Sequence, residues 1–144
     1  MLPVYLISRQ TAVGFHSLEI AGAVLWAVAL LGEGLADRQL KQFKRSHHGP
    51  KAVCQEGLWR YSRHPNYFFQ SLLWWSLFLM ALPAPWGGFA ILAPLAMLWF
   101  LLRVTGIPLT EKLAVERKGI DYQTYQRTTS AFVPWWRKRL PTSP

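Results

Sequence analysis

The chain has 144 residues, of which 51% are hydrophobic, and it carries a formal net charge of +9. That length suits a single domain, and the mixture indicates apolar spans joined by charged loops. A nucleic-acid-binding domain would carry its basic residues on a soluble scaffold rather than beside apolar spans, so we expect no nucleic-acid partner. The single cysteine excludes an internal disulfide.

The first apolar segment runs from Thr11 to Gly32 and continues without a helix breaker toward Lys44. Its uncharged core is short enough for a signal peptide. Only Arg9 would supply the basic start of such a peptide, and no clear small-residue cleavage site follows, so a membrane span is the preferred interpretation. The extension beyond the span predicts a helix that emerges from the membrane.

The longest uncharged segment has no Asp, Glu, Lys or Arg from Tyr67 to Leu102. A turn-forming run of Pro and Gly over 83–88 divides it. The segment therefore predicts two helices of about one bilayer crossing each, Tyr67 to Leu82 and Trp86 to Leu102. Pro94 lies inside the second of these helices and predicts a kink.

The basic residues test this arrangement independently of hydropathy. Seven Lys and Arg lie between Arg38 and Arg63, eight lie from Arg103 onward, and the turn over 83–88 has none. Three spans would place both basic groups on one face of the membrane, which the positive-inside rule makes cytoplasmic. We therefore expect an all-α integral membrane domain over residues 1–144, with about three transmembrane helices.

Beyond the third predicted span, a break at 105–108 precedes two short helical segments, Leu109 to Lys118 and a second from Asp121 onward. We expect both helices to lie on the cytoplasmic surface. Trp135 and Trp136, followed by three basic residues, are typical of an interfacial anchor to anionic lipid. Membrane lipids are therefore an expected partner.

Charged residues on the extension of the first span share one helical face, because they are spaced four, four and three apart: Glu33, Asp37, Lys41 and Lys44. Spacing alone favours a solvated face over a binding site. No metal site is predicted, because the paired spacing of zinc ligands is missing from the candidates His47, His48, Cys54 and His64.

The segment Gly57 to Tyr67 concentrates Arg, His, Asn and Tyr directly before the second span. Pro65 suits the first turn of a helix and disfavours helix before it, so this segment predicts a turn that delivers its side chains to a helix N-terminus. Such a terminus favours an anion, and Arg60 and Arg63 can add bidentate contacts to phosphate. An interfacial anchor for lipid head groups explains the same residues equally well.

Three stretches together resemble a known family: Gly57-Leu-Trp-Arg-Tyr-Ser-Arg-His-Pro-Asn-Tyr-Phe, Gly106-Ile-Pro-Leu-Thr-Glu-Lys and Tyr122-x-x-Tyr-x-Arg-Thr-Thr-Ser-x-Phe-x-Pro-Trp. They closely resemble the C-terminal region of the steroid 5-alpha-reductase-like family, in particular its bacterial branch of membrane proteins. Isoprenylcysteine carboxyl methyltransferases and phospholipid methyltransferases share the Arg-His-Pro-x-Tyr element, whereas the other two stretches favour the reductases. The resemblance covers about Leu25 to Trp136.

The resemblance implies NADPH as the cofactor, held in a pocket open to the cytoplasm. It also implies hydride transfer to an activated carbon–carbon double bond of a lipidic substrate, and a bacterial inner membrane as the location. It carries the family's cofactor contacts onto Asp37, Lys41, Lys44, Asn66 and Arg103. With Arg60 and Arg63 from the turn, these residues form the predicted cofactor site.

Two further positions belong to the predicted cofactor site. Gln70 stands where characterised steroid reductases have Glu, and it keeps the ability to hydrogen-bond a carboxamide although it cannot carry a negative charge. Glu111 lies near a contact that the family makes with its C-terminal tail. The resemblance assigns no catalytic residue here, because the family's acid pair lies on additional N-terminal spans that we expect this chain to lack.

Three interpretations of the short chain stay open: a truncated reading frame, an inactive remnant, or a subunit of a homo-oligomer. Two other functions also stay open. An S-adenosylmethionine-dependent membrane methyltransferase typically has two adjacent carboxylates in its cytoplasmic tail, where this chain has the separated Glu111 and Glu116. A non-catalytic membrane protein could use the same basic face to bind lipid head groups or a partner, and retained cofactor affinity would argue against it.

Overall fold

A computed structural model describes residues 2–8, 16–46, 49 and 51–138 of the chain. Within them the fold is all-helical, and it contains no β-strand beyond an isolated bridge between Ser62 and Ser130. The α-helices are α1 (Leu2–Ser8), α2 (Ser17–Ser46), α3 (Pro65–Ala81), α4 (Leu92–Trp99), α5 (Ile107–Lys118) and α6 (Ile120–Thr128). Two 3-10 helices, η1 (Gly57–Arg60) and η2 (Gly87–Ile91), and a π-helix, η3 (Phe100–Val104), complete them.

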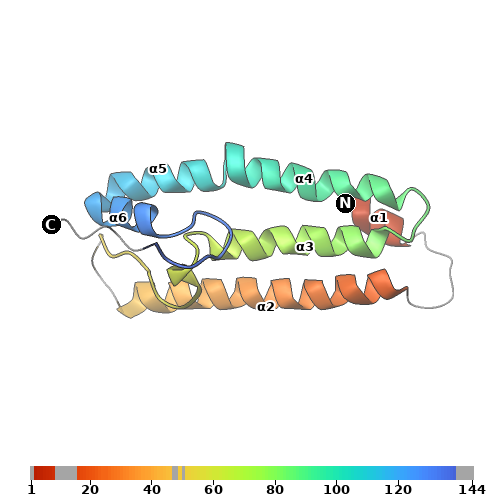
Figure 1. The fold of residues 1–144 in the computed structure, drawn as a ribbon, viewed down its shortest axis with the longest axis horizontal. Coiled ribbons are helices and arrows are strands. Elements are labelled where there is room, and N and C mark those ends of the chain that lie inside the picture. The colour runs from red at the N-terminus through yellow and green to blue at the C-terminus, as the bar shows by residue number, and fades with distance from the viewer. Residues whose placement is uncertain (1, 9–15, 47–48, 50, 139–144) are drawn as a thin grey trace.

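The helices form three antiparallel rows (Figure 1). Helix α3 lies in the middle, with α2 on one side and the continuous run from η2 to α5 on the other. Helix α6 and the segment that follows it lie at one end of the bundle, together with the C-terminal end of α2 and the loop that leads into α3. Helix α1 lies at the opposite end, so the two ends of the bundle are built differently.

The contact between α2 and α3 depends on small side chains. The buried residues of α2 recur every seven positions, which keeps them on one face: Gly22, Ala29, Ala36 and Phe43. A Cβ atom at Gly22 would come within 2.9 Å of the carbonyl oxygen of Ser76 on α3. The absence of a side chain therefore allows the two backbones to approach closely, as small residues do between membrane helices.

Two helical segments are long and apolar enough, by length and composition, to cross a membrane: Ser17–Ser46 and Gly87–Lys118. The first is the predicted first span with its extension, although part of the span predicted from Thr11 lies outside the described residues. The second joins the predicted third span to α5. Helix α3 corresponds to the predicted second span and is 17 residues long.

The predicted kink at Pro94 takes another form. Pro94 is the third residue of α4, and η2 ends directly before that helix. The departures from α-helical geometry flank α4 instead, in η2 before it and η3 after it. A step between α4 and α5 is visible where η3 ends (Figure 1). The predicted break before α5 and the two short helices that follow it are confirmed.

Candidate functional site

A cavity of about 240 Å³ is lined by residues at the end of the bundle that holds α6. Its walls come from the C-terminal half of α2, the loop and turn before α3, the start of α3, and helices α5 and α6. Aromatic and aliphatic side chains make up much of the lining, and basic and polar side chains lie among them. Those used below are Lys44, Trp59, Arg63, His64, Asn66, Tyr67, Lys118, Tyr122 and Tyr125.

Glu111 on α5 connects the elements around this cavity. Its Oε1 atom accepts from Nε of Arg63 at 2.9 Å and from the hydroxyl of Tyr122 at 2.9 Å, and it lies 2.8 Å from Nε2 of His64. The Oε2 atom accepts from the side-chain amide of Gln126. One carboxylate thus joins α5, α6 and the turn before α3, and only 12% of its side chain is exposed.

The environment of Glu111 keeps it ionised. Burial alone would raise its pKa, but the hydrogen bonds from His64, Arg63 and Gln126 outweigh burial and lower the pKa to about 2. Burial also raises the pKa of the Tyr122 hydroxyl, and the negative charge of Glu111 adds to that increase. The tyrosine therefore stays protonated and donates to a permanent carboxylate.

Arg63 is hydrogen-bonded to α5, to α6 and to the segment that follows α6. Besides its contact with Glu111, one of its terminal nitrogens donates to the carbonyl oxygens of Gln126 and Thr129, each at 2.7 Å. Its backbone N–H donates to the carbonyl of Ser130 at 2.9 Å. Much of the guanidinium fork is thus used by the protein itself, which gives Arg63 a positioning role in addition to its place in the cavity wall.

Tyr125 and Trp59 fix the opposite wall. Tyr125 is 2% exposed, and its hydroxyl donates to the carbonyl oxygens of Trp59 and Ser62. The indole N–H of Trp59 donates to the carbonyl of Ala36 on α2 at 2.9 Å. Helices α6 and α2 are therefore tied together through the short η1 helix.

Asn66 carries the one buried polar side-chain atom without a hydrogen-bond partner among the described residues, its Oδ1. Asn66 lies in the first turn of α3, directly after Pro65, and it lines the cavity. Beside it, the rings of His64 and Tyr67 stack with their centroids 5.3 Å apart. A buried acceptor without a donor costs free energy, so this atom is suited to a ligand that brings an N–H or O–H group.

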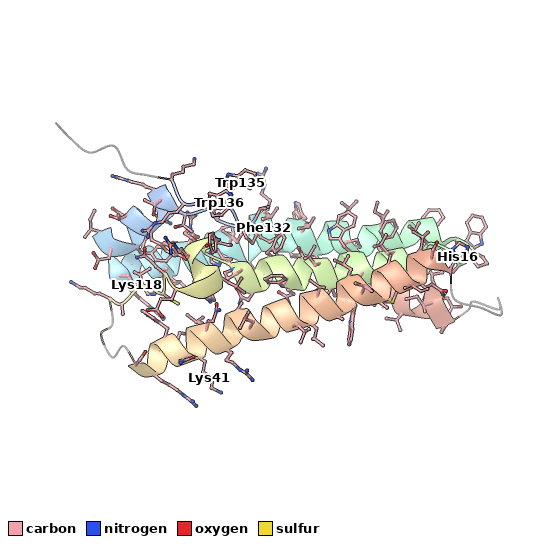
Figure 2. All side chains as sticks on the ribbon, turned by 60° about the horizontal axis from the view of Figure 1, so that its bottom comes forward. His16, Lys41, Lys118, Phe132, Trp135 and Trp136 are labelled. Atoms are coloured by element: carbon pink, nitrogen blue, oxygen red, sulfur yellow. The ribbon has the colours of Figure 1, made fainter. Side chains whose placement is uncertain are left out.

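The structure brings some of the predicted cofactor residues together. Lys44, Arg63 and Asn66 line the cavity, and Glu111 contacts three residues of its walls. Lys41 lies on the side of α2 that faces away from the other helices (Figure 2), where it lines a shallow depression with Arg38, Gln42 and Arg45. The remaining predicted residues do not line the cavity; Asp37, Arg60 and Arg103 are exposed, and Gln70 is half-buried one turn beyond Asn66.

Several residues of the site were not predicted as site residues. His64 was considered as a metal ligand and as part of a motif, and Tyr122 only as part of a motif. Lys118 was placed at the end of a surface helix. A signal for Tyr122 and Glu111 was present, since both belong to stretches that carry the family resemblance, but their contact was not readable because Gly119 separates their helices with a φ of 64°.

Metal binding has no support in this cavity. Cys54 and His64 both line it, yet the described residues contain no group of three or more His, Cys, Asp or Glu side chains suited to a metal ion. His47 and His48 lie outside the described residues. Burial raises the pKa of the Cys54 thiol, so the thiol is neutral at physiological pH.

Across the described residues, fold and site define an all-helical protein with two helical segments long and apolar enough to cross a membrane, and with a cavity at one end of the bundle that holds three Lys and Arg side chains. Comparison with protein families matches residues 1–129 to the family described as "Protein of unknown function (DUF1295)". The chain belongs to that family. Neither the curated proteins nor the solved structures contain a match to this chain.

Proposed function

We propose that this protein is a membrane-embedded, NADPH-dependent oxidoreductase, or a truncated relative of one, that reduces an activated carbon–carbon double bond of a lipid-like substrate. The observation that carries the proposal is the unpaired Oδ1 of Asn66 in the wall of a cavity that also holds basic and aromatic side chains. The steroid 5-alpha-reductase-like resemblance of the same segment supports this choice of cofactor.

The residues of the cavity fit a nicotinamide dinucleotide. The buried Oδ1 of Asn66 can accept a hydrogen bond from a carboxamide NH₂, which the nicotinamide ring carries. The rings of Tyr67 and Trp59 offer apolar surface for a planar heterocycle, and Lys44 supplies positive charge for phosphate. A cavity of about 240 Å³ is smaller than the roughly 300–1,000 Å³ of ligand pockets, so it suits one part of a dinucleotide rather than the whole.

The protein's own contribution in such chemistry is binding and orientation. When bound, reduced nicotinamide supplies the hydride for the double bond. Asn66 would fix the rotation of the ring through the carboxamide, and the Glu111 network would hold the cavity walls in place. Aromatic side chains around Asn66 would exclude water from the reacting atoms.

We also propose a three-span topology with the cavity on the cytoplasmic side. Helix α3 has 17 residues, which is at the short end of the roughly 17–25 that cross a bilayer. The antiparallel rows bring the loop before α3 and the C-terminal segment to the same end of the bundle (Figure 1). Both contain basic residues, and their shared location supports a cytoplasmic orientation, which in a bacterium is the inner face of the inner membrane.

The direct test is a comparison of two cofactors. Isothermal titration calorimetry on the detergent-purified protein would measure binding of NADPH and of S-adenosylmethionine under the same conditions. We expect NADPH to bind and S-adenosylmethionine not to bind. Binding of S-adenosylmethionine alone would replace the proposal with a membrane methyltransferase, and binding of neither would favour a non-catalytic membrane protein.

A further inference from the structure

Two lysines from different helices line the cavity without a carboxylate partner among the described residues. Lys44 is on the last turns of α2, and Lys118 ends α5. Every Asp and Glu of the chain is among the described residues, and the ion pairs found there all belong to Glu111, which holds Arg63 and His64. The positive charges of Lys44 and Lys118 are therefore not neutralised by an acidic side chain of the described chain.

These lysines are close enough to influence each other. Burial lowers the pKa of Lys118, and the positive charge of Lys44 lowers it further. The Cys54 thiol, which lines the same cavity, interacts electrostatically with both. Lys44 is exposed and Lys118 is half-buried. Two like charges that are close together raise the free energy of the folded protein, and an anion between them would remove that cost.

A simpler role explains part of this arrangement. Lys118 lies in the last turn of α5, where a cation interacts favourably with the helix dipole, and its Nζ atom is 5.7 Å from the centre of the Tyr122 ring. These contacts account for a lysine at position 118. They do not account for the convergence of Lys118 with Lys44 on a cavity that lacks a matching carboxylate.

We propose that Lys44 and Lys118 form a phosphate-binding site in the wall of the cavity, suited to a phosphate or pyrophosphate group. Lysine ammonium groups bind phosphate as compact point charges with several donors each. For the source of the phosphate the inference rests on the proposed function, since a dinucleotide would bring its phosphates to the cavity that contains Asn66. An anionic lipid head group carries the same chemistry and is the other source.

Inorganic pyrophosphate is the probe, because it contains neither nicotinamide nor lipid. Calorimetric titrations at fixed ionic strength would compare the wild-type protein with Lys44→Gln, Lys118→Gln and the control Lys112→Gln. Lys112 is exposed on the same helix as Lys118 and does not line the cavity. We expect each cavity variant to weaken pyrophosphate binding by about tenfold or more, and the control by less than about twofold.

Equal weakening by all three variants would overturn the inference, because it would show a general effect of net charge rather than a site. Absence of pyrophosphate binding to the wild type would overturn it as well. Circular dichroism of each variant would confirm that the helices are retained.

Competition identifies the source of the phosphate. Displacement of pyrophosphate by NADPH identifies a dinucleotide as the source of the phosphate. Displacement by vesicles of phosphatidylglycerol, but not by vesicles of phosphatidylcholine, identifies a lipid head group as the source. Either result supports the phosphate site. The inference and the proposed function can fail separately. If pyrophosphate binding depends on the two lysines but NADPH does not bind, only the phosphate site is supported. If NADPH binding depends on Asn66 but on neither lysine, only the proposed function is supported.

Discussion

Nε2 of His64 and Oε1 of Glu111 lie 2.8 Å apart, although 47 positions separate the two residues in the chain. His64 is the residue directly before α3, and Glu111 is on α5. Their contact fixes the N-terminus of the central helix against the third row of the bundle. It also sets the position of Asn66, which follows His64 by two residues, so the geometry of the cavity depends on this carboxylate.

Replacement of Glu111 by Gln should destabilise the protein markedly. The substitution leaves the guanidinium of Arg63 without its carboxylate partner in a site where the two side chains are 11% and 12% exposed. Removal of one partner from a buried ion pair costs about 3 kcal/mol or more. Unfolding by denaturant in detergent micelles would measure the loss.

Glu116→Gln is the matched control for that measurement. Glu116 is on the same helix, is exposed, and takes part in no ion pair among the described residues. We expect its replacement to change the unfolding free energy by less than about 0.5 kcal/mol. Equal effects at positions 111 and 116 would contradict the role given to the Glu111 network.

Stability should also fall in acid because of Glu111. Its pKa is about 2 in the folded protein and near 4.5 when unfolded, so its stabilising contribution is fully present above about pH 4.5. That contribution decreases as the pH falls and is lost as the pH passes through about 2. The difference corresponds to at most about 3 kcal/mol. The wild type and Glu111→Gln should therefore differ less in unfolding free energy at pH 2.5 than at pH 7, and a constant difference would contradict the assignment.

The long helices could be predicted from the sequence because their limits are set locally, whereas the short helix α1 was not predicted. The uncharged run between Tyr67 and Leu102, divided at 83–88, gives the two neighbouring helical rows, and Pro65 marks the start of α3. The extension of α2 as far as Lys44 followed from the absence of a helix breaker, and the helix ends two residues later, at Ser46. The flanking 3-10 and π segments of α4 were not predicted, since they depend on packing between helices rather than on residue preferences.

The site could be predicted only in part. Asn66 and Lys44 were identified through the family resemblance, and both line the cavity. Helical spacing grouped Lys41 with Lys44, but Lys44 lines the cavity and Lys41 lines the depression on the outer side of α2. They differ because α3 and the turn before it cover only one side of α2. The roles of His64 and Lys118 come from contacts between distant segments, which spacing within one helix does not contain.

Tyr125→Phe should loosen the connection between α6 and η1. Its hydroxyl donates to the buried carbonyl oxygens of Trp59 and Ser62, so its removal leaves acceptors without a donor. We expect a loss of about 1–2 kcal/mol in unfolding free energy. Tyr61→Phe is the control, because the Tyr61 ring contacts Trp136 but its hydroxyl makes no hydrogen bond within the described residues. An equal loss of unfolding free energy in both variants would contradict the role given to the Tyr125 hydroxyl.

Lys44 and Lys41 should differ in their effect on NADPH binding. The family resemblance assigns both to the cofactor, but Lys44 lines the cavity while Lys41 lines the outer depression of α2. Each alanine variant removes one positive charge, so the long-range attraction for a dinucleotide changes equally. We expect Lys44→Ala to weaken NADPH binding by about tenfold and Lys41→Ala by a few-fold at most. The reverse order in calorimetric titrations would indicate that the cofactor binds on the outer face of α2.

If Asn66 holds the cofactor, replacement of its side chain in Asn66→Ala should weaken the binding of NADPH. Gln42→Ala is the control, since it removes a side-chain amide from the outer face of α2. Loss of one buried hydrogen bond predicts NADPH binding about tenfold weaker in Asn66→Ala, with Gln42→Ala within about twofold of the wild type. Wild-type affinity in Asn66→Ala would contradict the proposed cofactor site.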